Sequence, residues 1–141
     1  MRLAFFVLGI TMAALSTLCM AEETREDPSD QVVLIKQAAW VQGVAKACRS
    51  DNAAASQHLV QAYDGWWSRN AIVRSMLGWL EAGPQGAEQA SLRRVYEDVA
   101  RDVAKVFKEK QLNDPEDFAQ ECDRFTKELI EGMWDVADGS Q

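Results

Sequence analysis

Histidine is nearly absent from this chain: among 141 residues it has a single one, His58, alongside three cysteines. The chain also lacks a glycine-rich phosphate loop, a Gly-x-Ser-x-Gly nucleophile elbow and a His-Glu-x-x-His metal motif. One histidine and so few cysteines supply too few soft ligands for a mononuclear zinc site. We therefore expect a protein that is not an enzyme and that holds no metal and no cofactor. An enzyme would need a site assembled from distant residues, such as Asp64 and Glu81 with His58.

Basic residues are also in short supply. The chain has 15 lysines and arginines against 22 aspartates and glutamates, so its formal net charge is −7. Phosphate backbones and anionic lipid headgroups repel such a chain, so we do not expect nucleic acid as a partner. The charge is uneven, because residues 113–141 carry nine acids and two bases whereas residues 93–112 carry six bases and four acids. Either the last two helices pair partly through opposite charge, or the acidic last helix is a face for a basic partner.

A long apolar run occurs only at the N-terminus. Residues 3–15 are apolar but fall short of the roughly 20 residues that a spanning helix needs, and Arg2 precedes them. Small residues at Cys19 and Ala21 suit a cleavage site after Ala21. We therefore predict a signal peptide at residues 1–21, export to the periplasm or the medium, and no stable membrane insertion after cleavage. The alternatives are an uncleaved anchor and a lipoprotein, but a lipoprotein would need a small residue where Leu18 stands.

The cysteine count acquires a meaning once the leader is removed. Cys19 leaves with the signal peptide, so the mature chain keeps Cys48 and Cys122. In an oxidising compartment such a pair usually forms a disulfide bond. We predict the bond Cys48–Cys122; the alternative is two buried, unpaired thiols.

Strand-like alternation is absent, and apolar residues recur instead at helical spacing over most of the chain. Residues 22–29 form an acidic tail, residues 30–137 the helical domain and residues 138–141 a polar tail. Within the domain, four apolar stripes are Leu34, Ala38, Val41, Ala45 and Cys48; Leu59, Tyr63, Trp66, Asn70, Val73, Leu77 and Leu80; Leu92, Val95, Val99, Val103, Val106 and Phe107; and Phe118, Cys122, Phe125, Leu129, Met133 and Val136.

The helix ends are marked by residue types that favour caps. Ser29 or Asp30 can cap the first helix, and Gly83 followed by Pro84 ends the second. Asp114 followed by Pro115 is the best helix start in the chain. The stretch from residue 51 to residue 82 is either one bent helix or two, with a break near residues 68–70. The predicted fold is an all-α, single-domain up-down bundle of four helices, or five if that stretch breaks.

The adjacent Trp66 and Trp67 raise the question of a site. At 100° per residue Trp66 lies on the core stripe and Trp67 at its edge. One interpretation is that the stretch 51–82 is the most enclosed helix of the bundle. The other starts from Asn70, a polar amide inside the apolar stripe, which needs hydrogen-bond partners. Together with Trp67 and Arg74 it would line a binding site.

These features favour an exported, non-enzymatic protein that acts by binding another protein, in an immunity, chaperone or inhibitor-like role. The alternative is a binder of a small apolar or aromatic ligand, with a pocket near Trp67, Asn70 and Arg74. At the level of the general plan, namely an export signal, a helical domain and one disulfide, the chain resembles periplasmic immunity proteins and small acid-stress chaperones. No motif in the sequence transfers a residue from either class.

Overall fold

The structure is a computed structural model that describes residues 28–49, 53–83 and 86–136. The predicted signal peptide at 1–21 and the polar tail at 138–141 lie outside these residues. Every regular element among them is an α-helix: α1 Pro28–Ala47, α2 Ala53–Arg69, α3 Ala71–Glu81, α4 Ala87–Asn113 and α5 Pro115–Glu131. The all-α prediction is confirmed, and the stretch 51–82 forms two helices rather than one.

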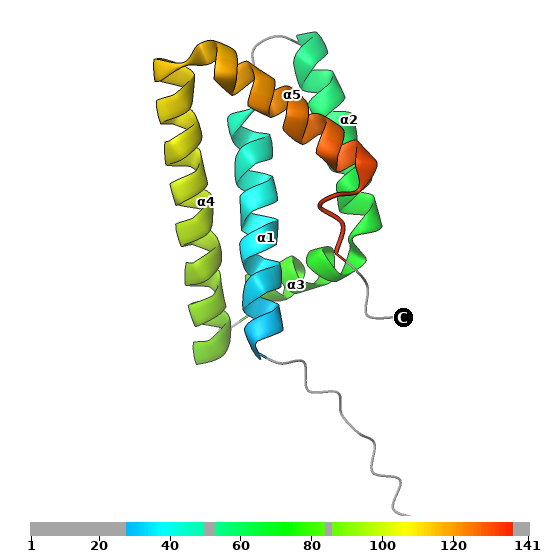
Figure 1. Cartoon of the computed structure of the whole chain (residues 1–141). Helices are drawn as coiled ribbons and strands as arrows, with labels where there is room; N and C mark the ends of the chain where they lie inside the picture. The colour runs from blue at the N-terminus through cyan, green and yellow to red at the C-terminus, as the bar shows by residue number, and fades with distance from the viewer. Residues whose placement is uncertain (1–27, 50–52, 84–85, 137–141) are drawn as a thin grey trace, which may run out of the picture.

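Three of the helices run along the long axis of the molecule and two lie across it (Figure 1). Helix α1 stands in the middle, with α4 on one side and α2 on the other. Helix α3 crosses one end, and α5 runs diagonally across the other end from α4 to α2. The simple up-down arrangement of four helices is therefore not confirmed, because α3 turns away from the direction of α2.

The end of α3 and the start of α5 follow the residues that the sequence marks for them. Asn70 separates α2 from α3 with a non-helical backbone (φ −102°, ψ 66°), and Gly83 follows α3 at a positive φ of 70°. Asp114 caps α5, because its Oδ1 accepts from the backbone N–H of Asp117 at 3.0 Å, and Pro115 occupies the first helical position. Helix α1 begins at Pro28, inside the predicted tail, so the prediction that Ser29 or Asp30 caps it is wrong, because both lie within its first turn.

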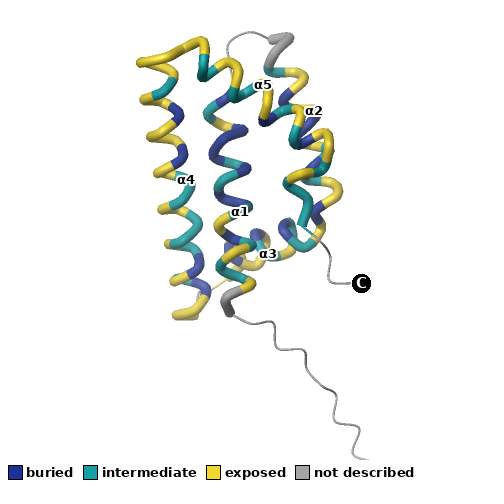
Figure 2. The backbone as a smooth tube through the Cα atoms, in the orientation of Figure 1, coloured by how far each residue is buried: buried dark blue, intermediate teal, exposed yellow. Residues whose placement is uncertain are grey.

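Helix α1 is the most enclosed element. Its fully buried residues are Ile35, Ala38, Ala39, Val41 and Val44. Figure 2 shows buried and half-buried segments along much of α1, whereas α4 presents an exposed outer face. The expectation that the stretch 51–82 would be the most enclosed is wrong. The small residues of α1 let α4 approach closely, which the apolar circumference of residues 51–82 did not reveal.

Two residues of the predicted stripes lie at the surface. Val106 is 59% exposed and Met133 is 66% exposed. Val106 lies beside Phe107, which takes the core position. Met133 misses the stripe because α5 ends at Glu131, where Gly132 adopts a left-handed conformation with φ 76°. The residues after it form a turn instead of a further helical turn.

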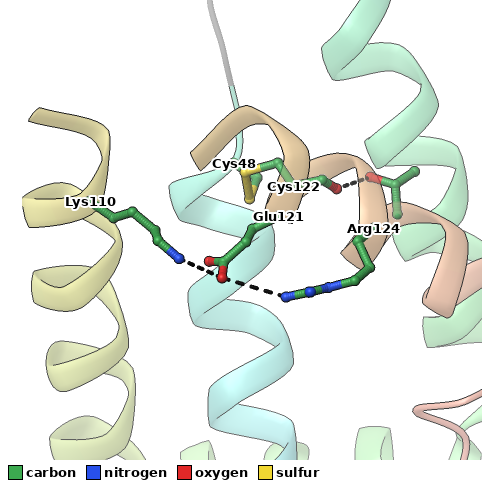
Figure 3. The surroundings of a disulfide bond; sticks show 6 residues. Cys48, Lys110, Glu121, Cys122 and Arg124 are labelled. Atoms are coloured by element: carbon green, nitrogen blue, oxygen red, sulfur yellow. Dashed lines mark hydrogen bonds and ion pairs between the residues drawn. A yellow bond between two sulfur atoms is a disulfide. The ribbon is translucent and has the colours of Figure 1, made fainter. Parts of the chain in front are cut away.

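The predicted disulfide bond is present. Cys48, just after α1, is joined to Cys122 of α5 with a Cα–Cα distance of 5.5 Å. Beside it, Glu121 lies between two cations (Figure 3): it pairs with Lys110 of α4 at 2.5 Å and with Arg124 at 3.5 Å. Lys110 also pairs with Asp117 at 2.7 Å. The acids of α5 therefore hold a base of α4, as opposite-charge pairing of the last two helices predicts. None of the described helices has the length and apolar character needed to cross a membrane.

Candidate functional site

The amide of Asn70 is used inside the molecule. Its side chain is 1% exposed, and its Nδ2 donates to the Trp66 carbonyl at 2.7 Å and to Asp135 at 3.0 Å. Its Oδ1 accepts from the backbone N–H of Val136 at 2.6 Å. Asn70 therefore fastens the turn after α5 to the junction of α2 and α3. These contacts satisfy the amide without a ligand.

Two further groups hold the turn after α5 in place: the backbone carbonyl of Trp134 and the side-chain carboxylate of Asp135. The Trp134 carbonyl accepts from Trp66 Nε1 at 2.8 Å and from Gln37 Nε2 at 3.0 Å. Asp135 forms an ion pair with Arg69, whose Nε lies 2.7 Å from Oδ2. Burial alone would raise the pKa of Asp135, but hydrogen bonds from Arg69 and Asn70 and the Arg69 charge hold it below 3.8. The turn is thus a structural fastening of α5 onto α2.

Trp67 and Arg74 share a surface pocket of about 350 Å³, the tryptophan pocket, and Asn70 does not line it. Trp67 is half-buried and stacks on Tyr63, with ring centroids 6.3 Å apart. Arg74 donates to the Trp67 carbonyl and, at 2.9 Å, to the Ser68 carbonyl at the end of α2. The structure therefore brings together two of the three predicted binding residues. The Arg74 guanidinium already donates hydrogen bonds to backbone carbonyls at the end of α2.

A larger depression, of about 830 Å³, follows the seam between α1 and α4. We call it the basic groove. Its sides carry four cations: Lys46, Arg49, Arg101 and Lys108. Small residues also line it: Gly43, Ala45, Ala47, Ala100 and Ala104. Short side chains leave space above the seam, so the close contact between α1 and α4 creates the hollow.

One polar cluster joins the two depressions. Gln42 and Tyr96 line both of them, so the basic groove and the tryptophan pocket meet there. The Tyr96 hydroxyl donates to Gln42 Oε1, and Gln42 also hydrogen-bonds Tyr63. Burial raises the pKa of Tyr63 above 10.0, although Gln42 and Arg49 act in the opposite direction. Burial, and then the proximity of Tyr63 and Glu81, raises the pKa of Tyr96 above 10.0. Both phenols therefore stay protonated at neutral pH.

A third pocket, also of about 350 Å³, lies between α3 and the first turns of α1 and α4. Its walls are mainly apolar and include Leu34, Ile72, Met76 and Trp79, which is 45% exposed.

The catalytic alternatives gain no geometric support. His58, Asp64 and Glu81 are all exposed, and no hydrogen bond or ion pair joins their side chains within the described ranges. The same ranges contain no group of three or more potential metal ligands.

Sequence reasoning missed the basic groove, although a signal for it exists. Gln42, Lys46 and Arg49 recur at intervals of four and three residues, and Arg101 and Lys108 lie two turns apart, so each set shares one helix face. That these two faces adjoin depends on α1 and α4 packing side by side, which the periodicity of a single helix does not reveal.

In comparisons with known proteins, no protein-family model, no curated protein and no solved structure matches this chain.

Proposed function

We propose that this chain is an exported, non-enzymatic helical protein that acts by binding a segment of another protein in the basic groove. The length of the groove carries the proposal. Along α4 it extends from Tyr96 to Gln111, about 22 Å at the rise of an α-helix. About seven residues of an extended chain would fill that length. The volume of about 830 Å³ lies within the range of small-molecule pockets, so it is the elongated shape that favours a chain segment.

The side chains of the groove support the same proposal. Tyrosine and arginine are enriched among the residues that dominate binding energy at protein interfaces. Tyr63, Tyr96 and Phe107 offer aromatic surface, and Arg49 and Arg101 offer guanidinium groups. The glycine and the alanines that line the groove have short side chains, so the backbone of a bound segment can approach them closely. The proposed function involves no nucleic acid, no cofactor and no stable membrane insertion.

Export is supported by the predicted leader and agrees with the disulfide bond, since disulfides persist in oxidising compartments. Mass spectrometry of native material tests it: the N-terminus is expected at Glu22, and Cys48 and Cys122 are expected to resist alkylation. A retained leader or free thiols would refute the export proposal.

A groove-blocking variant tests the binding proposal. Ala104 is exposed and lines the groove, so Ala104→Trp fills the space without changing the charge or opening the core. Ala119→Trp is the matched control, because Ala119 is exposed on α5 and lines none of the three pockets described above. A partner captured from envelope or medium fractions should be lost with Ala104→Trp and kept with Ala119→Trp. Equal capture by both variants would contradict the proposed site.

The tryptophan pocket favours a second candidate, the binding of a small aromatic ligand. Its volume of about 350 Å³ suits a small molecule, and Trp67 offers a stacking surface beside Arg74. Titration with aromatic carboxylates should quench tryptophan fluorescence in the native chain and fail to do so in Trp67→Phe. Quenching that is equal in both proteins would refute this candidate.

A further inference from the structure

The four cations of the basic groove are not neutralised by the rest of the described chain. Lys46, Arg49 and Lys108 make no ion pair with any described residue, and Arg101 pairs only with Asp98, at 3.0 Å, which does not line the groove. No carboxylate appears among the lining residues. This is unexpected in a chain with 22 acids against 15 bases, because random placement would bring acids to the seam.

The acids are concentrated elsewhere. Residues 113–141 carry nine acids and two bases. Within α5, Asp117 and Glu121 neutralise Lys110, which lies on α4 one turn beyond Phe107. The groove itself therefore keeps a local positive charge on an acidic molecule. Electrostatic complementarity of this kind selects a partner by the sign of its charge.

The polar cluster adds a hydrogen-bond donor at one end of the groove. Gln42 Oε1 accepts from the Tyr96 hydroxyl, and the Gln42 amide bonds Tyr63. When the amide donates to the Tyr63 oxygen, the Tyr63 hydroxyl proton is free for a ligand. A carboxylate only accepts hydrogen bonds, so it matches both this donor and the ammonium and guanidinium groups along the walls.

We propose that the basic groove binds an acidic segment of a partner protein, held by its carboxylates between the cations of α1 and α4. This inference rests on the proposed function, since it names the chemistry of the segment that would occupy the same groove. Lys46 and Arg49 form one wall, and Arg101 and Lys108 form the other. The partner's backbone lies over the alanines between them.

Two charge-reversal variants test the proposal with the full mature chain. In Lys46→Glu/Lys108→Glu both groove lysines are reversed. In the control, Lys36→Glu/Lys105→Glu, two exposed lysines of the same helices that do not line the groove are reversed. Both proteins therefore have the same net charge. The probe is a fluorescein-labelled peptide of alternating glutamate and leucine, about seven residues long to match the groove, and the measurement is fluorescence anisotropy.

The groove variant should bind the peptide at least about tenfold more weakly than the control, because two charge pairs are lost and two repulsions are added. Binding should also weaken as salt is added. Equal affinity of both variants, or equal binding of a peptide with glutamine in place of glutamate, would overturn the proposal. Stronger binding of heparin or single-stranded DNA than of the peptide would also overturn it, in favour of a general polyanion site.

The failure of this inference is distinguishable from failure of the proposed function. If the glutamine peptide binds as well as the glutamate peptide, and Ala104→Trp abolishes both, the groove is a peptide site without acidic preference. If Ala104→Trp leaves the capture of a native partner unchanged, the groove is not the binding site, whatever its charge preference.

Discussion

The seam between α1 and α4 yields the sharpest prediction, the substitution Gly43→Ala. A Cβ at Gly43 would lie 3.0 Å from Cγ1 and 3.1 Å from Cβ of Val103. Val103 is buried, and its β-branched side chain is restricted to one rotamer in a helix, so it cannot turn away. Overpacking of this kind costs about 1–3 kcal/mol. Replacing glycine by alanine inside a helix also stabilises the folded state by about 1 kcal/mol, because alanine has the higher helix propensity.

The overpacking term outweighs the propensity term. We expect Gly43→Ala to lower the free energy of unfolding by about 1 kcal/mol. Gly78→Ala is the matched control, because Gly78 is an exposed residue inside α3 and a Cβ there would meet nothing within 4 Å. It should raise the free energy of unfolding by about 0.5–1 kcal/mol. The same change therefore has opposite signs at two helical glycines.

Urea denaturation followed by tryptophan fluorescence measures both effects, and a double-mutant cycle assigns the cause. In a Val103→Ala background the Cγ1 contact at 3.0 Å is removed and only the Cβ contact at 3.1 Å remains, so Gly43→Ala should become less destabilising, with a coupling free energy of about 1 kcal/mol. If Gly43→Ala stabilises the native chain as Gly78→Ala does, or if its effect is the same in both backgrounds, the account of the α1–α4 seam is refuted.

Three further predictions concern the fastenings of the fold. Asn70→Ala should lower the free energy of unfolding by about 3 kcal/mol, because the hydrogen bonds of its side-chain amide are lost. The control Asn113→Ala, at an exposed position, should change it by less than about 0.5 kcal/mol, and equal urea midpoints of the two variants would contradict this. Cys48→Ser/Cys122→Ser, which opens a loop of 74 residues, should lower it by about 4 kcal/mol, and an unchanged midpoint would contradict the structural role of the bond. The pKa of Asp135 is lowered from 3.8, so its contribution is complete above pH 3.8 and is lost as the pH falls through the folded value. The difference in stability between the native chain and Asp135→Asn should shrink below pH 3.8 in acid titrations, and a pH-independent difference would argue against the ion pair.

Much of the fold follows from local patterns. The helix start at Asp114 and Pro115, the end at Gly83 and the core position of Trp66 are confirmed, because each depends on nearby residues. Asn70 was correctly placed inside the apolar stripe. Two of its partners, Asp135 and Val136 in the turn after α5, could not be predicted, since they lie 65 and 66 residues away and no periodicity links them to Asn70.

The candidate site was less predictable than the fold, because it too depends on contacts between residues that lie far apart in the sequence. Trp67 and Arg74 share a pocket because they lie on one side of the α2–α3 junction, and a helical projection finds this relation. The basic groove depends on the contact of α1 with α4, which are separated by two helices in sequence. Helix packing is decided by the fit of whole faces, and a small-residue stripe such as Gly43, Ala47 and their neighbours gives no strong signal in composition.

The same stripe of small residues links the packing of α1 and α4 to the binding that we propose for the groove. The small residues that allow α1 and α4 to approach are the same ones that leave the groove open above the seam. A larger side chain at Gly43, which faces the contact between α1 and α4, would separate the helices and widen the groove. A larger side chain at Ala104, which faces the groove, would fill it with little effect on the core. Variants at the two positions therefore separate the geometry of the walls from the space between them. If Gly43→Ala altered peptide affinity while Ala104→Trp did not, the distance between the two rows of cations, and not the volume of the groove, would determine binding.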